Sequence, residues 1–299
     1  MGTYGYTNDL FVLAFDHRGS FAKSFFGISG RQPTPEEAKK ISEYKETIFD
    51  GFKVAATDGV AKESAGILCD EQFGLNVLTR AKADGFHFAC PAEKSGQTEF
   101  DFEYGKDYPQ HIEKVDPTFV KVLVRYNPED DAEMNRRQTA RLSELSKYCN
   151  SKNRKFIFEL LVPATEKQLS QFGGDKQRYE RELRPQLMVQ SLAQIQKDGV
   201  EADIWKLEGV DQVADAEKIG QQVRSGGRDQ VGVVVLGRGE DDKKVKEWLA
   251  VAAKVPAYIG FAVGRTIFTE ALKGLSAGTL NRDQAVQAIA KKYKGFVDH

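Results

Sequence analysis

The sequence alternates between short apolar runs and longer amphipathic segments, and this alternation repeats eight times along 299 residues. The short runs are rich in β-branched and aromatic residues, as buried strands are, and the long segments carry the apolar spacing of helices. The predicted strands are Leu10–Asp16, Ala65–Asp70, His87–Pro91, Phe119–Tyr126, Lys155–Val162, Ile204–Glu208, Val231–Leu236 and Tyr258–Val263. The predicted helices include Pro35–Thr57, Gly74–Ala83, Asp131–Ser151, Arg178–Asp198, Asp215–Arg224, Asp241–Lys254 and Arg282–Lys294. Eight successive β–α units predict an α/β fold, a closed (β/α)8 TIM barrel, with a doubly wound open sheet as the alternative.

Helix boundaries in the sequence support this interpretation. Thr34 is expected to cap a helix whose first residue is Pro35, with acidic residues in the first turn. Gly199, Gly226 and Gly227 follow helical patterns, where glycine commonly ends a helix. Because no linker or change in composition divides the chain, residues 1–299 are expected to form one barrel domain.

Composition excludes several classes of partner. Lys and Arg total 43 against 44 for Asp and Glu, so the net charge of -1 provides no field to attract nucleic acid or an acidic membrane surface. The longest apolar stretch, Val231–Leu236, is far below the roughly 18 residues that a membrane span requires. The start of the chain lacks the pattern of a secretory signal, and three cysteines in no CxxC pairing favour a reducing compartment. We therefore expect a cytoplasmic protein.

Charged residues stand where the predicted strands end. Barrel enzymes place their active sites at the carboxyl ends of the strands, so polar residues there are informative. These positions carry Asp16, His17, Arg18, Asp70, Glu71, Glu93, Lys94, Lys121, Arg125, Glu159, Lys206, Glu208, Arg238 and Arg265. Any one of them could be half of a structural ion pair, because buried charges are usually paired. Acids and bases that converge from several strands on one mouth favour an active site.

Lys206 is the residue with the most specific chemistry. Period-two alternation places Lys206 and Glu208 on the inner face of their strand and Trp205 on the outer face. A lysine confined beside another cation such as Lys121 can act as a neutral amine that forms a Schiff base with a carbonyl, and Glu159 could move the protons. The alternative for Lys206 is a structural ion pair with Glu208 or Glu159.

Two glycine-arginine turns suggest a phosphate site. Gly237-Arg238-Gly239 follows strand seven and Gly264-Arg265 follows strand eight, the place where barrels often bind phosphate. The alternative is two ordinary tight turns. Asp242 stands where a GxGxxG motif needs glycine, and no Walker sequence occurs, so nucleotide binding is not supported.

The residues favour no metal cofactor. The four histidines, His17, His87, His111 and His299, do not suggest a three-histidine zinc site. Magnesium held by carboxylates of Asp16, Asp70 and Glu71 stays open as the alternative.

Seven segments together resemble the DUF2090 family, the domain of unknown function at the C-terminus of bacterial 5-dehydro-2-deoxygluconokinases of myo-inositol catabolism. They are LAFDHRGSF (13–21), PAEKSGQTEFDFEYG (91–105), KVLVRYNPEDD (121–131), FELLVPAT (158–165), DIWKLEG (203–209), VVLGRG (234–239) and GFAVGRTIF (260–268). The kinase half is absent from this sequence. The resemblance implies a functional association with a sugar kinase.

That family is similar, more distantly, to class I tagatose-bisphosphate and sulfofructose-phosphate aldolases. Their Schiff-base lysine lies in a D-x-x-K-x-E context, which here corresponds to Asp203, Lys206 and Glu208. Those aldolases also share a proton-transferring glutamate, a second lysine, a strand-one aspartate and a glycine-arginine pair that holds phosphate. The resemblance implies that the corresponding residues here are Glu159, Lys121, Asp16, Gly264 and Arg265. The segment 91–105 and Arg238 have no counterpart in those aldolases and are candidates for setting specificity.

We therefore expect a lyase, a cofactor-independent class I aldolase acting on a small phosphorylated keto sugar or keto sugar acid. The resemblance implies 2-deoxy-5-keto-gluconate 6-phosphate as substrate, with dihydroxyacetone phosphate and malonate semialdehyde as products. The expected catalytic residues are Lys206, Glu159, Lys121 and Asp16, and the expected substrate- and phosphate-binding residues are Arg18, Arg125, Glu208, Gly237, Arg238, Gly239, Gly264 and Arg265. The alternatives are a sugar-phosphate isomerase or epimerase that uses the same carboxylates, and a non-catalytic sugar-phosphate sensor. Exposed helices could also dock a second copy of the chain.

Overall fold

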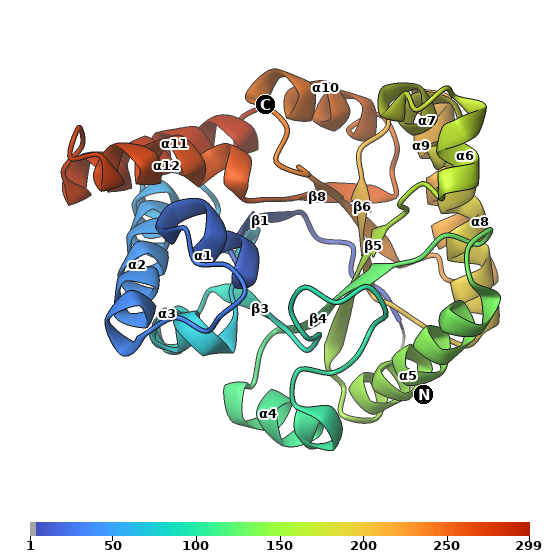
Figure 1. Ribbon diagram of the computed structural model, residues 1–299, viewed down its shortest axis with the longest axis horizontal. Helices are drawn as coiled ribbons and strands as arrows, with labels where there is room; N and C mark the ends of the chain where they lie inside the picture. The colour runs from blue at the N-terminus through green and yellow to red at the C-terminus, as the bar shows by residue number, and fades with distance from the viewer. Residues whose placement is uncertain (1–3) are drawn as a thin grey trace.

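Eight parallel strands close into a barrel in the computed structural model, which describes residues 4–299 (Figure 1). The first three residues of the predicted domain, where the chain was expected to lack a secretory signal, lie outside the described residues. The strands are β1 (Leu10–Ala14), β2 (Ala65–Leu68), β3 (His87–Pro91), β4 (Phe119–Arg125), β5 (Lys155–Leu161), β6 (Ile204–Glu208), β7 (Gly232–Leu236) and β8 (Tyr258–Val263). The barrel closes between β1 and β8, where Leu10 pairs with Gly260 and Leu13 with Val263. The predicted (β/α)8 barrel is therefore confirmed, and the open sheet is excluded.

Helices surround the strands in Figure 1 and follow them along the chain. The long helices are α2 (Pro35–Thr57), α3 (Glu71–Ala83), α5 (Ala132–Ser151), α8 (Arg184–Lys197), α9 (Val213–Val223), α10 (Asp242–Ala252), α11 (Arg265–Ser276) and α12 (Arg282–Val297). The shorter ones are α1 (Gly19–Phe26), α4 (Tyr108–Val115), α6 (Glu166–Gln171) and α7 (Lys176–Glu182), with a 3-10 turn η1 (Gly105–Asp107). No helix within residues 4–299 combines the length and apolarity needed to cross a membrane.

The predicted boundaries of α2 are confirmed. The Thr34 side chain accepts a hydrogen bond from the Glu37 amide at 3.3 Å, and the Glu37 carboxylate accepts one from the Thr34 amide at 2.8 Å. This reciprocal cap satisfies two amides that the first helical turn leaves without partners. The predicted positive φ of Gly199 is also present, at 81°.

Two of the differences between the predicted and observed helices have a clear local cause. The single helix expected over Arg178–Asp198 is wrong, because α7 ends at Glu182 and α8 starts anew at Arg184. Pro185 has no amide hydrogen and restricts the residues before it, so a continuous helix through this point is unfavourable. α3 starts at Glu71, before the predicted Gly74, because the Asp70 side chain accepts the Phe73 amide at 2.8 Å and caps an additional turn.

The core has two parts. Outward-facing strand residues such as Trp205 pack beneath the helices, as the alternation predicted. Inward-facing apolar residues fill the amino-terminal half of the barrel, among them Val12, Phe119, Ile157 and Ile204. This apolar plug forms a floor, and the charged inward residues of β4, β5 and β6 come next along the same strand faces.

Candidate active site

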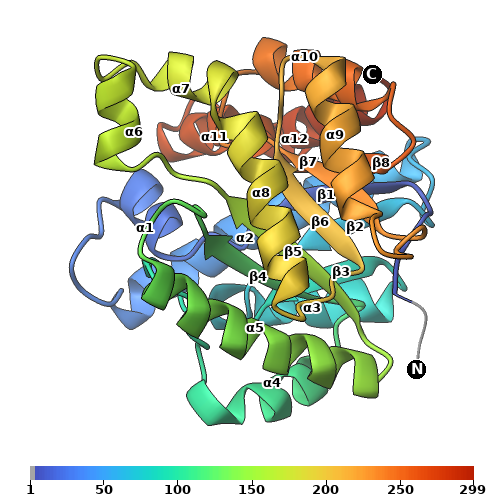
Figure 2. The same cartoon turned by 90° about the vertical axis from the view of Figure 1, so that its right-hand side faces the viewer.

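A cavity of about 1310 Å³ opens above this floor, at the carboxyl ends of the strands. Helices α1 and α6, which lie toward the left in Figure 2, both contribute to its wall. The cavity is lined by all the residues predicted for the site: Asp16, Arg18, Lys121, Arg125, Glu159, Lys206, Glu208, Gly237, Arg238, Gly239, Gly264 and Arg265. The fold thus brings these residues to one pocket, while their individual roles stay predictions.

Lys121 is the centre of the buried charge cluster. Its Nζ lies 2.8 Å from Oδ2 of Asp16, 2.7 Å from Oε1 of Glu93 and 2.9 Å from Oε2 of Glu159. These carboxylates come from the ends of β1 and β3 and from the inner face of β5. The side chain of Lys121 is only 1% exposed, so its charge is balanced by protein groups rather than by water.

Glu159 connects Lys121 to Lys206. The Oε1 atom of Glu159 lies 2.9 Å from Nζ of Lys206, while its other oxygen contacts Lys121. The register of the sheet explains the contact, because Glu159 and Lys206 are paired neighbours on β5 and β6. One carboxylate thus bridges the two lysines at the bottom of the pocket.

The electrostatic environment separates the pocket carboxyls into two groups. Burial by itself raises the pKa of Glu159 and of Asp16, but the ammonium groups of Lys121 and Lys206 outweigh burial and hold both pKa values below their ordinary range. Burial also raises the pKa of Glu93, and there the opposing charges of Lys121 and Arg18 do not overcome it. Burial opposes the charge of Lys121, yet its three carboxylates raise its pKa well above the usual value.

A second buried ion pair lies beside the pocket. Lys45 of α2 pairs with Asp70 at the end of β2, and its Nζ also donates to the backbone oxygens of Phe15 and His17, at 2.8 and 3.1 Å. Burial lowers the pKa of His17 to about 4, with the nearby cations Arg265, Lys206 and Lys45 adding to the effect and Asp16 opposing it. The imidazole of His17 is therefore neutral at pH 7.

The three carboxylates considered for magnesium are engaged separately. Asp16 contacts Lys121, Asp70 contacts Lys45, and Glu71 contacts His111 at 3.0 Å. Across residues 4–299, no group of three or more His, Cys, Asp or Glu residues is arranged to hold a metal ion. The described residues thus do not bring these carboxylates together as a ligand set.

The arginines at the mouth fall into two groups. Arg18 contacts Glu103 at 2.8 Å, Arg184 contacts Glu208 at 3.1 Å, and Arg238 contacts Glu180 and Glu208 at 2.7 and 3.1 Å. In contrast, the guanidinium groups of Arg125 and Arg265 donate to backbone oxygens, those of Gln97 at 2.8 Å and of Arg238 at 2.6 Å. A neutral carbonyl leaves a cation uncompensated, so these two arginines are the better placed to attract an anion.

The glycine-arginine turns form a cradle at the β7 and β8 ends. Gly239 and Arg238 both have positive φ, 86° and 51°, and α11 begins at Arg265. A helix N-terminus presents amides without intrahelical partners, which suits an anion. A side chain at Gly264 would overlap the backbone oxygen of Ala14, so only glycine allows this close approach of β8 to β1. The phosphate site at these turns stays a prediction.

Asp203 and Glu208 of the D-x-x-K-x-E segment hold backbone in place. Asp203 lies at the amino-terminal end of β6, where its carboxylate accepts the amides of Gly5 and Phe156, both at 2.8 Å. Glu208 accepts a hydrogen bond from the Val162 amide at 3.0 Å, in addition to its ion pairs with Arg184 and Arg238. Lys206, between them, is the member of this segment that faces the charge cluster.

Glu93 was not among the residues predicted for the site, although it is one of the charged residues that follow the predicted strand three. Glu93 lies in the pocket wall and contacts Lys121. A lone acid in the loop segment PAEKSG gives no periodic pattern that places it inward, and only the folded loop shows the contact. Arg184, which holds Glu208, was also missed, because it lies within the predicted helix Arg178–Asp198 and no strand end marks it.

Comparisons with known proteins agree with this fold. The fold and site define a (β/α)8 barrel protein with a charged pocket at the carboxyl ends of its strands. Over residues 4–299 the sequence matches the family described as an uncharacterized protein conserved in bacteria, DUF2090, and the chain belongs to this family. The predicted family membership is thereby confirmed. No curated protein matches the chain.

Several solved structures share the fold. Cgl0159 from Corynebacterium glutamicum is 16% identical, with 99% of this chain and 88% of that chain covered and a TM-score of 0.60. An archaeal fructose-1,6-bisphosphate aldolase, solved with its catalytic Lys covalently bound to the carbinolamine intermediate of the substrate, is 12% identical, with 97% and 95% covered and a TM-score of 0.57. The YdjI aldolase from Escherichia coli K12 is 12% identical, with 84% and 86% covered and a TM-score of 0.52. At such identities the likeness establishes the fold alone.

Proposed function

We propose that the protein is a lyase, a class I aldolase in which Lys206 forms a Schiff base with a phosphorylated keto sugar or keto sugar acid. The observation that carries the proposal is the contact of 2.9 Å between Lys206 and Glu159 on the floor of a cavity that also holds an uncompensated cation, Arg265. An amine that attacks a carbonyl needs a partner that takes and returns protons, and Glu159 is within hydrogen-bond distance. The fold that this chain shares with Schiff-base-forming aldolases supports the same chemistry.

The contacts suggest how the protons move. Glu159 accepts the proton that the Lys206 ammonium must lose before its Nζ attacks the ketone. In the neutral carbinolamine the nitrogen of Lys206 carries no positive charge. Lys206 then no longer lowers the pKa of Glu159, so the Glu159 carboxyl holds this proton more readily. Glu159 then returns the proton to the departing hydroxyl, and water leaves as the iminium forms. Lys121 and Asp16 fix the orientation of Glu159 and keep the cluster charge-balanced.

The cradle at the ends of β7 and β8 is proposed to hold the phosphate. Arg265 supplies a cation, and Gly237, Gly239 and Gly264 allow backbone amides to approach the phosphate oxygens. Arg125 lies on β4 and Arg265 follows β8, so these two arginines lie on opposite sides of β6, which carries Lys206. Arg125 can therefore bind a second anionic group of the substrate. Arg18 holds the loop after β3 through the backbone oxygen of Glu93, and Arg238 pairs with Glu208, so these residues shape the wall.

The substrate proposed in detail is 2-deoxy-5-keto-gluconate 6-phosphate, which carries a phosphate at one end and a carboxylate at the other. Cleavage gives dihydroxyacetone phosphate and malonate semialdehyde. A sugar kinase of myo-inositol catabolism would supply this substrate in the cytoplasm, so we propose a functional association with such a kinase. We place these roles on one domain, residues 1–299, and propose that a second copy docks on its exposed helices.

The test is borohydride reduction in the presence of dihydroxyacetone phosphate, fructose 1,6-bisphosphate and 2-deoxy-5-keto-gluconate 6-phosphate, each separately. Intact and peptide mass spectrometry should find a ligand-dependent adduct on Lys206, and product analysis should find two shorter carbon chains. A product with an unbroken carbon skeleton would instead indicate an isomerase. Binding without an adduct and without turnover would indicate a sensor and overturn the proposal.

A further inference from the structure

Glu93 carries an unused oxygen in the wall of the pocket. Its Oε1 atom accepts a hydrogen bond from Lys121 at 2.7 Å, whereas its Oε2 atom is buried without any hydrogen-bond partner among the described residues. The residue is 6% exposed and lines the cavity. A buried carboxylate oxygen without a partner is unfavourable, so a hydrogen-bond donor that a substrate brings to this wall of the cavity would stabilise Oε2 of Glu93.

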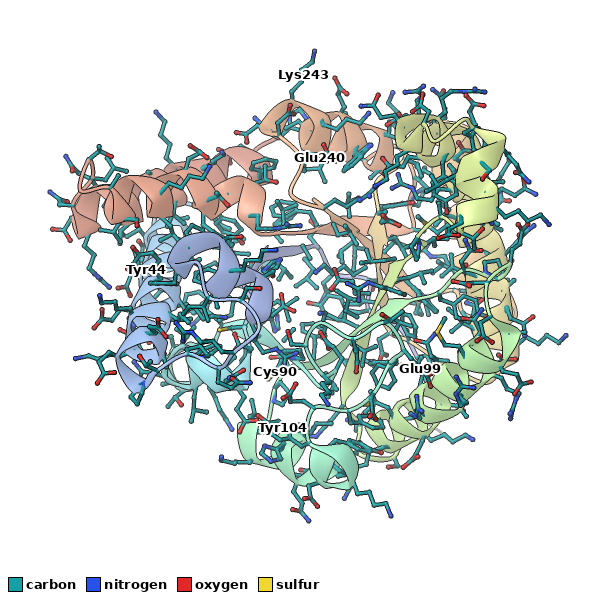
Figure 3. All side chains as sticks on the ribbon, in the orientation of Figure 1. Tyr44, Cys90, Glu99, Tyr104, Glu240 and Lys243 are labelled. Carbon is teal, nitrogen blue, oxygen red and sulfur yellow. The ribbon has the colours of Figure 1, made fainter. Side chains whose placement is uncertain are left out.

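The segment around Glu93 is firmly held. Arg18 donates to the backbone oxygen of Glu93 at 2.6 Å, and Glu93 forms an antiparallel bridge with Phe102. Further along the segment, Glu99, labelled in Figure 3, pairs with Arg137 and Arg141 of α5 at 2.8 and 2.9 Å. The backbone at Glu93 is therefore held in place, and the lack of a partner for Oε2 does not result from a loosely packed loop.

While Lys206 carries a positive charge, as it does in the iminium, Glu93 is the carboxyl around Lys121 best suited to accept a proton. Asp16 and Glu159 are stabilised as carboxylates by both lysines, which lowers their pKa values and weakens them as bases. Burial raises the pKa of Glu93 despite Lys121 and Arg18, and Asp16 adds a repulsion that acts in the same direction. A carboxylate with a raised pKa is a stronger general base near neutral pH.

We propose that Glu93 is a further catalytic residue, whose Oε2 atom accepts the proton of the substrate hydroxyl that becomes the aldehyde oxygen. This inference rests on the proposed Schiff-base function of Lys206. A continuous chain of contacts joins the two residues, from Glu93 to Lys121 at 2.7 Å, to Glu159 at 2.9 Å and on to Lys206 at 2.9 Å. Glu93 thus acts on the part of the substrate that leaves as aldehyde, while Lys206 holds the ketone part.

The step balances within these groups. With the ketone carbon bound to Lys206 as an iminium, Glu93 takes the proton from the hydroxyl two carbons away. The O–H electron pair forms the aldehyde C=O bond, and the C–C bond between the two parts breaks. Its electron pair forms the C=C bond of an enamine and neutralises the iminium nitrogen. Glu93 is left as a carboxylic acid, and Lys206 carries the enamine.

The test compares reactions that need this base with reactions that do not, in Glu93→Gln. Adduct formation on Lys206 with dihydroxyacetone phosphate and borohydride, and exchange of a carbon-bound hydrogen of dihydroxyacetone phosphate in heavy water, involve no hydroxyl deprotonation. The rates of adduct formation and of exchange should both stay within about twofold of wild type. The rate of cleavage of 2-deoxy-5-keto-gluconate 6-phosphate, or of fructose 1,6-bisphosphate if wild type prefers that substrate, should fall roughly 10²- to 10⁴-fold. Glu93→Asp should recover part of the cleavage rate, and the acid limb of its pH profile should shift.

Glu201→Gln is a matched control, because Glu201 is also a carboxylate in an ion pair, with Arg228 at 2.6 Å, but does not line the cavity. Its cleavage rate should equal that of wild type. Full cleavage by Glu93→Gln would overturn the assignment. Equal loss of adduct, exchange and cleavage would also overturn it, since Glu93 would then only position Lys121. A wild-type protein without any Lys206 adduct would instead refute the proposed function, and the role of Glu93 with it.

Discussion

Lys121 balances the charges of the pocket, since three carboxylates reach its ammonium group while Lys206 touches only one of them. Removing one partner of a buried ion pair leaves an uncompensated charge, which costs more than the pair contributes. The two lysines therefore differ in what they do, although both point into the same cavity. Lys121 is held by three carboxylates, and Lys206, held by one, is the lysine to which we assign the proposed Schiff base.

Lys206→Met should abolish cleavage and adduct formation, by roughly 10³-fold or more, without unfolding the protein. Lys121→Met should lower the free energy of unfolding by about 3 to 5 kcal/mol, because Asp16, Glu93 and Glu159 lose their common cation. Urea denaturation at pH 7 of both variants measures this difference. Equal stabilities would show that Lys121 is not the centre of the cluster.

Stability should depend on pH through His17. Its imidazole binds a proton below about pH 6.5 when unfolded but only near pH 4 when folded, so between these values the unfolded state takes up more protons. Stability therefore decreases as the pH falls from 6.5 toward 4. Between pH 7 and 5 this one group should account for roughly 1 to 2 kcal/mol. Urea denaturation of wild type and His17→Phe at both pH values isolates the contribution, and an unchanged pH dependence in the variant would contradict it.

Arg265 and Arg238 should differ in their effect on substrate binding. Arg265→Gln removes a cation without a carboxylate partner and should raise KM for a phosphorylated substrate about 10- to 100-fold. Arg238→Gln removes a cation already paired with Glu180 and Glu208, so its KM should change less. Steady-state kinetics of the two variants provides the comparison. A larger effect for Arg238 would move the phosphate site toward β7.

At the scale of elements, the site depends on how strand ends and helix starts meet. β8 passes so close to β1 at Gly264 that a side chain there has no space, and α11 starts at the next residue. The Lys121 cluster draws its groups from β1, the β3 loop, β4 and β5, so a shift of one strand would separate the charges. Close packing of the strand ends thus determines the geometry of the pocket.

Gly264→Ala should therefore lower stability by about 1 to 3 kcal/mol through overpacking and should also raise KM, because α11 is displaced with its amides. Gly295→Ala is the matched control, since an added Cβ at this position in α12 meets no atom within 4 Å. That variant should keep its KM and gain up to about 1 kcal/mol from helix propensity. Similar behaviour of both variants would argue against the close contact at Gly264.

At the scale of the molecule, the closed barrel surrounds a wide pocket lined by charged residues. The apolar plug in its amino-terminal half supplies stability, and the charged carboxyl-terminal half supplies the site. If the mouth binds a phosphorylated ligand as proposed, the ligand would stabilise the folded state, because it would bind the folded chain and not the unfolded one. Ligand binding should thus be visible in the stability of the whole barrel.

Dihydroxyacetone phosphate at 100 times its Kd should stabilise the folded state by about 2.7 kcal/mol, which corresponds to a Tm increase of roughly 5 °C. Differential scanning fluorimetry measures the shift, and Arg265→Gln at the same ligand concentration should show a much smaller one. Glycerol at equal concentration serves as the comparison that lacks phosphate. The same shift with glycerol would show that the phosphate is not what the site recognises.

The sequence by itself determined the number of strands, their succession along the chain and the inward direction of Lys206 and Glu208. These follow from local periodicity, because each strand alternates its side chains and each helix carries its own apolar stripe. Only the tertiary structure decided which acid meets which base. Glu159 bridges the two lysines because of the register between β4, β5 and β6, and Glu93 reaches Lys121 because a loop without periodicity folds back over the barrel. The partners of buried charges depend on the distances between strands and loops far apart in the chain, and those distances exist only once the barrel has closed.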